Sequence, residues 1–291
     1  MSATLEPFLS FKGRKITAFG KAPNPSRKLL TEEEKLLLSK KDNPYSLFSA
    51  KSRGRLMKSL HAYCDTITLG RSLLKIKSLK PLKHHTFTTL TLSSDQRHCD
   101  KFIKREMLND MLQQMKRIYG TKHYIWKAEP QRNGNIHFHI LTESFIPHQE
   151  VRTIWNKIQD KLDYVKLAKK WHEGYSPNST DIHSLKKIND VVAYCGKYMS
   201  KDEVGRPICG HTWGRSDKIA KLQPITLYES AELNEWLEIQ RNSIDNRIYN
   251  KDWSCTYVFK QQFNWNTMPK ESLEKLKSIV ASNVTLLNLN T

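Results

Sequence analysis

The sequence lacks the features of a membrane or secreted protein. No uninterrupted apolar run is long enough to cross a bilayer, and no basic amphipathic helix carries a strong apolar face. Residues 1–14 also lack the apolar core of a secretory signal. We therefore expect no membrane partner and a cytoplasmic location.

Cysteine is scarce and scattered. The chain has 5 cysteines, an odd number, and none of them forms a CxxC pair. This pattern argues against both a disulfide framework and a zinc ribbon, and it favours reduced thiols. The sequence also contains no internal repeat, no long low-complexity tract and no GxxxxGK[ST] phosphate-binding loop.

Acidic residues are in deficit. The 291 residues include 48 Lys and Arg but only 29 Asp and Glu, which gives a formal net charge of +19. A surplus of this size favours a polyanionic partner, and nucleic acid is the first candidate. The length suits one domain with additional segments. We expect a basic N-terminal arm over residues 1–50, a core over 51–216 and a C-terminal extension over 217–291 that packs on the core.

The local patterns of the core predict an α+β fold. Residues 86–92 are rich in β-branched and apolar side chains and predict a strand, whereas residues 100–119 show helical spacing of apolar residues. Two further strands are expected over 124–129 and 136–142. The Asn133-Gly134 pair between them is a strong hairpin signal.

The alternation in this hairpin places polar residues on one face. His137 and His139 are two residues apart, so both point to the same side of their strand. If the more apolar positions of both strands share the core face, Glu129 lies on the same side as the histidines. A two-residue turn would place Glu129 opposite Phe138, so we predict a loop of odd length that pairs Glu129 with His139.

Two imidazoles and one carboxylate form a candidate metal site. Mixed nitrogen and oxygen ligands suit Mg²⁺ or Mn²⁺ when the oxygens of an anionic substrate complete the coordination shell. Zinc would favour a closed tetrahedron instead. The alternative interpretation is that His137 and His139 are polar strand residues that face solvent or a helix.

A second candidate feature is a helix expected from Asn189 or Asp190 to about Lys201. Its apolar stripe is formed by Ile188, Val191, Val192, Cys195 and Met199. Its other face carries Tyr194, Lys197, Tyr198 and Lys201, so the tyrosines are not needed for the stripe. An isolated helical tyrosine is ordinarily structural, but two tyrosines beside two lysines favour a reactive face.

Together these segments resemble the HUH endonucleases that initiate rolling-circle replication, in particular the initiators of single-stranded DNA phages of the filamentous and microvirus types. The resemblance covers about Lys51 to Ser216. It rests on the order and spacing of the strand at 87–92, the segments 124–129 and 133–141, Trp155-Asn156, the tyrosine helix at 193–201 and the segment 210–216. Tyr194 with Lys197 is similar to the YxxK motif of eukaryotic-virus initiators, whereas Tyr194 with Tyr198 is similar to the two-tyrosine phage pattern.

The resemblance implies an HUH nuclease fold, which is RRM-like, with a central antiparallel sheet of about five strands and packed helices. It also implies a metal-dependent endonuclease and strand transferase that nicks and rejoins single-stranded origin DNA. Tyr194 would attack first, leaving a 5′-phosphotyrosine link and a 3′-OH primer, and Tyr198 would act at the regenerated origin. The implied metal ligands are His137, His139 and Glu129, and Lys197 would assist the catalytic tyrosines. Without a phosphate-binding loop, a separate host helicase is expected, together with a DNA polymerase.

Basic residues outside the tyrosine helix are candidates for DNA contact. A helix expected over residues 50–61 carries Arg53, Arg55 and Lys58, which can bind backbone phosphates or form a solvated face. Lys127 shares the expected metal face. Two rival functions remain: an HUH transposase or plasmid relaxase, and a non-enzymatic DNA-binding protein. Mobilisation relaxases usually place the tyrosine before the histidines, an order that this chain does not have.

Overall fold

The chain forms two compact units in the computed structural model, which describes residues 8–12, 15–19, 45–46, 48–171, 176–188, 190–200, 206–242, 247–251, 254–258 and 264–287. The first, here called the central unit, combines residues 32–60 and 80–220. The second, here called the terminal unit, combines residues 1–31, 61–79 and 221–291. Helix α2 (Ala50–Ser72) begins in the central unit and ends in the terminal unit.

The central unit contains a five-stranded antiparallel sheet in the order β7-β4-β6-β5-β9. The strands are β4 (Thr86–Thr91), β5 (Tyr124–Pro130), β6 (Ile136–Thr142), β7 (Thr180–Ser184) and β9 (Trp213–Arg215). This sheet, with its packed helices, confirms the predicted α+β class. The strands expected over 86–92, 124–129 and 136–142 are β4, β5 and β6.

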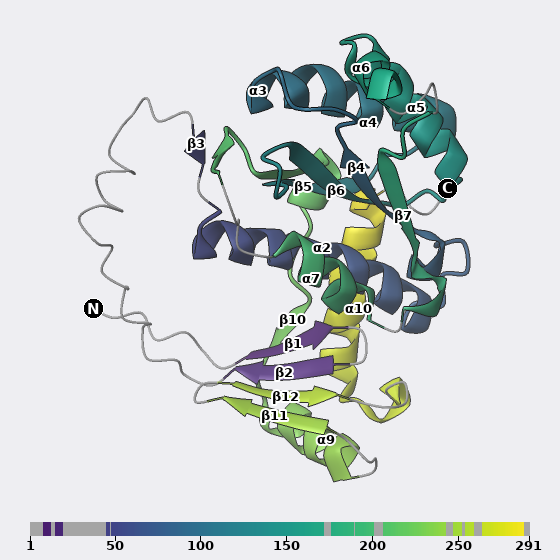
Figure 1. Cartoon of the computed structure of the whole chain (residues 1–291). Coiled ribbons are helices and arrows are strands. Elements are labelled where there is room, and N and C mark those ends of the chain that lie inside the picture. The colour runs from purple at the N-terminus through teal and green to yellow at the C-terminus, as the bar shows by residue number, and fades with distance from the viewer. Residues whose placement is uncertain are drawn as a thin grey trace, which may run out of the picture. The chain divides into compact units, whose positions relative to one another are not determined.

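One face of this sheet forms the hydrophobic core of the central unit. Ala128, Phe138 and Ile140 are fully buried in a cluster with Met111 and Trp155. The helices that supply this cluster lie on one side of the sheet (Figure 1). They are the contiguous segments α3 (Asp100–Phe102), η2 (Ile103–Leu108) and α4 (Asn109–Tyr119), followed by α5 (His148–Asp160) and α6 (Tyr164–Trp171). The apolar face expected from the alternation of the hairpin is therefore the core face.

The other face of the sheet carries α7 (Val191–Met199) and the first part of α2, as Figure 1 shows. The indole nitrogen of Trp213 on β9 donates a hydrogen bond to the hydroxyl of Ser52 on α2 at 2.8 Å. The guanidinium of Arg215 donates to the hydroxyl of Ser59, further along the same helix. These bonds fix α2 against the β9 edge of the sheet.

Short elements complete the central unit. Strands β3 (Tyr45–Ser46) and β8 (Ile208–Cys209) pair with each other. The remaining short segments are η1 (Leu82–His84), η3 (Leu185–Lys187) and α8 (Asp217–Ala220). Gly120 ends α4 with φ +64°, a left-handed conformation that glycine adopts without a steric penalty.

The terminal unit is built from both ends of the chain. Its antiparallel sheet has the order β10-β1-β2-β12-β11 (Figure 1). The strands are β1 (Phe8–Lys12), β2 (Lys15–Phe19), β10 (Thr226–Tyr228), β11 (Arg247–Lys251) and β12 (Ser254–Val258). Helices α9 (Ala231–Asn242) and α10 (Lys270–Leu287) and the short η4 (Trp265–Thr267) belong to the same unit. Leu9, Ile16, Trp236 and Val280 are buried in its hydrophobic cluster.

This division differs from the one expected from the sequence. Residues 1–50 were expected to form an arm and residues 217–291 an extension on the core. Instead, β1 and β2 pair with β10 and β12, so most of the expected extension shares a sheet with the start of the chain. In the part of the chain that the structure describes, no helix has the length and apolar character needed to cross a membrane.

Candidate metal and tyrosine site

Three candidate metal ligands converge on the face of the central sheet that lies opposite the core. Oε1 of Glu129 lies 2.8 Å from Nε2 of His137 and 3.0 Å from Nε2 of His139. The two Nε2 atoms lie 3.2 Å apart. Glu129 comes from β5, and both histidines come from β6, so one hairpin supplies all three groups.

The register of the hairpin differs from the predicted one. Glu129 pairs with His137, and Lys127 pairs with His139, because Pro130 pairs with Ile136 and residues 131–135 form the loop. The prediction of an odd-length loop is confirmed, but the predicted pairing of Glu129 with His139 is wrong. A loop that is two residues longer keeps every side chain on its expected face, so Glu129 still meets both histidines.

The pKa values of the site follow from burial and from mutual hydrogen bonds. Burial opposes the ionised form of Glu129, but hydrogen bonds with His137 and His139 outweigh it and hold the Glu129 pKa well below its usual range. Burial lowers the pKa of His139, although Glu129 acts in the opposite direction. The carboxylate is therefore ionised and the His139 imidazole neutral at pH 7, the forms that bind a cation.

The hydroxyl of Thr89 on β4 fixes the His139 ring. Its Oγ1 atom lies 3.0 Å from Nδ1 of His139, and the two residues are paired across the strands. If Nδ1 donates to the hydroxyl, the lone pair on Nε2 points toward Glu129 and His137. A histidine held through its distal nitrogen is the usual arrangement around a protein-bound metal.

The donor set fits a divalent cation. Ligand atoms at neighbouring corners of an octahedron around Mg²⁺ lie about 3 Å apart, and the three distances among Glu129, His137 and His139 are 2.8, 3.0 and 3.2 Å. Two nitrogen atoms that face each other this closely, with a carboxylate oxygen beside both, are an arrangement that a shared cation stabilises. Among the described residues this is the one group of three such ligands.

The tyrosine helix α7 lies over the same face. The side chain of Asp190 caps its first turn by accepting a hydrogen bond from the backbone N–H of Ala193 at 2.9 Å, as expected for one of the two proposed caps. Val191, Val192, Cys195 and Met199 are buried, so the predicted apolar stripe is confirmed at these positions. The helix ends at Met199, and Lys201 lies outside the described residues.

The two tyrosines surround the buried ring of Phe87. The Tyr194 and Tyr198 ring centroids lie 5.2 Å apart, and they lie 6.0 and 5.7 Å from Phe87. Phe87 also stacks on His139 at 5.7 Å. The Tyr198 ring itself lies 5.9 Å from the His139 ring, which brings the nucleophile candidates and the metal ligands together.

The tyrosines differ in their electrostatic surroundings. Burial raises the pKa of Tyr194, and a hydrogen bond with Tyr198 raises it further. The neighbouring Lys197 is exposed, and its Nζ atom lies 5.8 Å from the Tyr198 ring centroid. A cation in this position favours an anion near Tyr198, whether phenolate or phosphate.

The other expected DNA contacts have different surroundings. Lys127 is fully buried, donates to the carbonyl of Ala128 at 2.8 Å and lies 4.1 Å from the Phe48 ring centroid. Its ammonium group therefore stabilises the site face from within, and the expectation that it touches DNA is not met in this conformation. On α2, Arg55 and Lys58 are exposed and Arg53 is half-buried.

Sequence reasoning missed four residues that contact the site: Phe87, Thr89, Asp181 and His183. The first two occupy β4 and contact His139. Asp181 and His183 alternate on β7, with Oδ2 of Asp181 2.9 Å from Nε2 of His183. The signal that would have found this pair is the same one that marked the His137-Phe138-His139 segment, namely polar residues two positions apart on a short strand.

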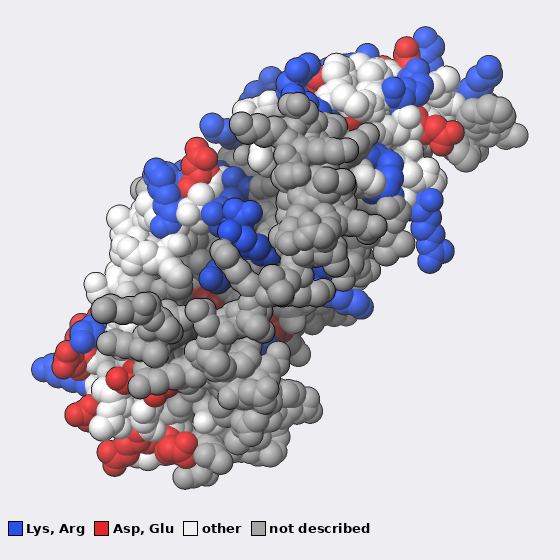
Figure 2. All heavy atoms as spheres, turned by 90° about the vertical axis from the view of Figure 1, so that its left-hand side faces the viewer, with Lys and Arg blue, Asp and Glu red and all other residues white. Residues whose placement is uncertain are grey.

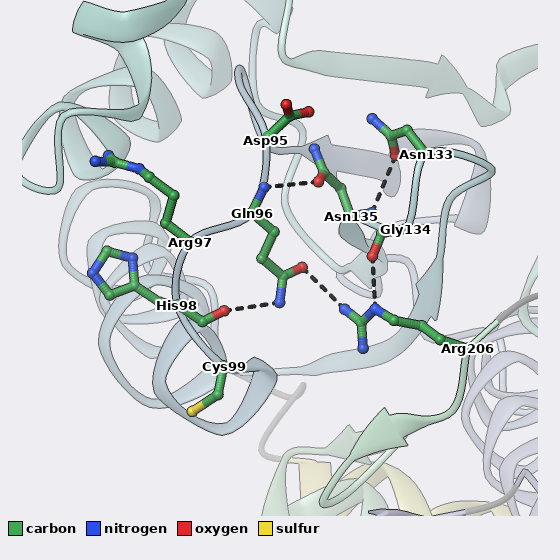
Figure 3. A pocket seen from close by; sticks show the side chains of 9 residues that line it. All are labelled: Asp95, Gln96, Arg97, His98, Cys99, Asn133, Gly134, Asn135 and Arg206. Carbon is green, nitrogen blue, oxygen red and sulfur yellow. Dashed lines mark hydrogen bonds between the residues drawn. The ribbon is translucent and has the colours of Figure 1, made fainter.

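A polar cavity of about 400 Å³ lies at the tip of the β5–β6 hairpin (Figure 3). Arg206 donates to the carbonyl of Gly134 at 2.7 Å and to Gln96 at 3.0 Å, while the backbone N–H of Gln96 donates to Asn135 at 2.9 Å. Arg206 also forms a two-pronged ion pair with Asp100. The candidate ligands and the tyrosines do not line this cavity; its network anchors the hairpin end that carries Glu129 and His137.

Comparison with known proteins agrees with this geometry. A family model of replication-associated proteins, that of the Replication-associated protein ORF2, matches residues 85–203. The matched segment includes β4, the hairpin and α7, and therefore all three candidate ligands and both tyrosines. The match supports a replication-associated protein that acts on DNA in the initiation of replication. No curated protein and no solved structure matches the chain.

Proposed function

We propose that this protein is a rolling-circle replication initiator of the HUH tyrosine class, which nicks and rejoins one DNA strand at an origin. The observation that carries the proposal is the ring contact between Tyr198 and His139, which joins a tyrosine pair to a group of metal ligands. Both parts lie within the segment that matches the replication-associated family.

Glu129, His137 and His139 would hold Mg²⁺ or Mn²⁺, with Thr89 orienting the His139 ring. The bound ion would polarise the scissile phosphate and offset the charge that develops on it. Lys197 supplies a second positive charge beside Tyr198, where it would bind a phosphate oxygen.

The proposed chemistry is a transfer of the phosphoryl group to tyrosine. The tyrosine oxygen attacks phosphorus, the bond from phosphorus to the 3′ oxygen breaks, and the strand keeps its 5′ phosphate on the protein. The released 3′-OH primes synthesis by a separate polymerase. Because the phosphotyrosine bond retains the energy of the broken linkage, rejoining requires no ATP, and a separate helicase would open the duplex.

We propose that Tyr198 attacks first and Tyr194 second, the reverse of the order expected from the sequence. Tyr198 supports this assignment because its ring lies against His139 and next to Lys197. The Tyr194 ring lies against Phe87 and His183 instead, and burial raises its pKa. A buried phenol that is hard to ionise is the poorer nucleophile until the site is rearranged by the first strand.

A direct experiment tests the proposal. The protein is incubated with Mn²⁺ and single-stranded DNA that carries the origin of the replicon encoding it, and protein–DNA adducts are resolved on a denaturing gel. We expect a nick and a protein-linked 5′ end. The double variant Tyr194→Phe with Tyr198→Phe should form no adduct, whereas Tyr228→Phe, at a tyrosine that is 73% exposed in the terminal unit, should behave as wild type.

The outcomes separate this function from its rivals. A non-enzymatic DNA-binding protein would bind the origin without any adduct. A related HUH transposase or relaxase would form an adduct on transposon ends or transfer origins and not on the replication origin. An adduct that persists in the double tyrosine variant would overturn the tyrosine mechanism. The single variants report the order: Tyr198→Phe should abolish the first cut, and Tyr194→Phe should abolish only the second.

A further inference from the structure

An imidazole–carboxylate pair lies beside the tyrosines and apart from the candidate metal ligands. Asp181 and His183 occupy β7, the edge strand next to β4. In the register of these strands, Asp181 lies opposite Thr89 and His183 opposite Phe87. Both residues therefore share the sheet face that carries His139 and is covered by α7.

His183 contacts both tyrosine rings. Its ring centroid lies 5.9 Å from that of Tyr198, nearly parallel at 23°, and 5.9 Å from that of Tyr194, edge-on at 65°. Tyr198 thus contacts two imidazoles, one belonging to a candidate metal ligand and one paired with a carboxylate. The Phe87 ring contacts His183 and both tyrosines and closes the cluster.

The pair has the polarity of a proton relay. With Nε2 of His183 2.9 Å from the Asp181 carboxylate, the proton of a neutral imidazole resides on Nε2 and the lone pair on Nδ1. The carboxylate stabilises the imidazolium that forms when Nδ1 accepts a second proton. The Asp181 and His183 side chains are 67% and 34% exposed, so the pair can exchange protons with water.

The neighbouring groups are less suited to this task. The ammonium group of Lys197 has no lone pair with which to accept a proton. In the proposed function, His137 and His139 use their nitrogen lone pairs for the metal. His183 is therefore the base in contact with the two phenol rings.

We propose that His183, oriented by Asp181, accepts the proton of whichever tyrosine attacks and returns it when that tyrosine leaves; this inference rests on the proposed function. During attack the O–H bond of the phenol breaks, its proton passes to Nδ1 of His183, the bond from the tyrosine oxygen to phosphorus forms, and the 3′ oxygen leaves with a proton from water. During rejoining a 3′-OH attacks and loses its proton to water, while His183 protonates the departing tyrosine oxygen. One imidazole in contact with both rings serves both steps.

The test compares variants that separate the ring from its nitrogen atoms. His183→Phe keeps an aromatic ring against Tyr194 and Tyr198 but has no proton acceptor. We expect the single-turnover rate of adduct formation to fall about 100-fold or more, as for the loss of a general base, with unchanged affinity for Mn²⁺ and single-stranded DNA. Asp181→Asn should lower the rate by a smaller factor. The matched control is His84→Phe, at an exposed histidine of η1, which should react at the wild-type rate.

Chemical rescue supplies a readout that a structural role would not change. Added imidazole should raise the rate of His183→Ala toward that of wild type and should leave His183→Phe, whose ring fills the space, unchanged. Thermal unfolding of each variant shows whether the fold is retained, and His183→Gln, of similar size and polarity, repeats the test should His183→Ala unfold.

The failures are distinguishable. A His183→Phe rate within about threefold of wild type, or no effect of imidazole on folded His183→Ala, overturns the assignment of His183 alone. If wild-type protein forms no adduct on the origin, the proposed function itself is overturned, and the role of His183 in it falls as well.

Discussion

Thr89 is the single residue whose side chain controls the orientation of a candidate metal ligand without binding the metal. Its hydroxyl lies 3.0 Å from Nδ1 of His139. Thr89→Val preserves the shape and removes this partner, so we expect the dissociation constant for Mn²⁺ to rise about 10-fold or more. Titration calorimetry of the purified protein measures the change.

The neighbouring residue offers a matched control for this prediction. The hydroxyl of Thr88 is buried on the opposite face without a hydrogen-bond partner among the described residues. Thr88→Val should therefore leave Mn²⁺ binding unchanged. Equal losses in the two variants would mean that any polar-to-apolar change in β4 disturbs the sheet and that Thr89 has no special role.

His85 makes the stability of the central unit sensitive to acid. Burial lowers its pKa to about 4, against the smaller opposing effect of its contact with the Pro81 carbonyl. An unfolded histidine titrates near pH ~6.5, so between these values the unfolded chain binds a proton that the folded chain does not. Stability should therefore be full above this window and should fall as the pH drops through it, by roughly 2 kcal/mol at pH 5.

Urea unfolding at pH 7 and pH 5 checks this sign and size. His85→Asn should weaken the dependence on pH, whereas His84→Asn, at the exposed neighbouring histidine, should keep it. An unchanged pH dependence in His85→Asn would assign the acid sensitivity to other groups, of which His139 is the first candidate because burial also lowers its pKa.

At the level of elements, the β5–β6 hairpin depends on one glycine. Gly134 has φ +84° and accepts a hydrogen bond from Arg206, while a Cβ atom at this position would meet nothing within 4 Å. Gly134→Ala should therefore destabilise the protein through backbone strain alone, by about 1 kcal/mol. Gly54 in α2 also has open space around it, and Gly54→Ala should stabilise the helix by roughly 0.5–1 kcal/mol.

Opposite signs for these two substitutions in urea unfolding would confirm the prediction. Loss of stability in both would point to steric conflict that the open surroundings of Gly54 and Gly134 do not provide.

The same hairpin shows what the sequence can and cannot predict. Alternation assigned Glu129, His137 and His139 to one face, because side-chain direction in a strand has a period of two residues. It could not choose between loops of three and five residues, because both preserve the face and differ only in which residues pair. The five-residue loop is selected by contacts of Asn135 and Gly134 with Gln96 and Arg206, and these residues are distant in sequence.

Other elements escaped prediction for the same reason. Local patterns identified the strands and helices of the central unit but carried no information on pairing between β1 or β2 and strands more than 200 residues away. Lys127 was assigned to a surface from its face of the strand, but Phe48 and α2 cover that face. Asp181 and His183 lie on a short edge strand whose pattern is weak until β4 is beside it.

At the scale of the whole molecule, the excess of positive charge predicts a DNA affinity that depends steeply on salt. Figure 2 shows Lys and Arg side chains over much of the described part of one face, with Asp and Glu gathered near its lower end. The basic residues of α2, Arg53, Arg55 and Lys58, are the expected phosphate contacts. Replacing all three with Ala should lower the slope of log affinity against log salt for single-stranded DNA by about 2.

A variant with the same change in net charge provides the control. Lys270, Lys275 and Lys277 lie on α10, and two of them form exposed ion pairs with Glu271 and Glu274. Their replacement with Ala should leave the slope nearly unchanged. Equal reductions in both triple variants, measured by fluorescence anisotropy over a salt series, would show that net charge acts as a whole and that α2 is not a local interface.

The placement of Tyr194 and Tyr198 one turn apart on α7 also fixes a stoichiometry. With ring centroids 5.2 Å apart, the two residues share a single approach for a DNA strand, so under the proposed function only one of them is loaded at a time. Both cuts of a replication cycle then belong to one polypeptide, with no second copy required. Each circle in progress would carry one covalently attached molecule, a ratio that counting protein per labelled circle can measure.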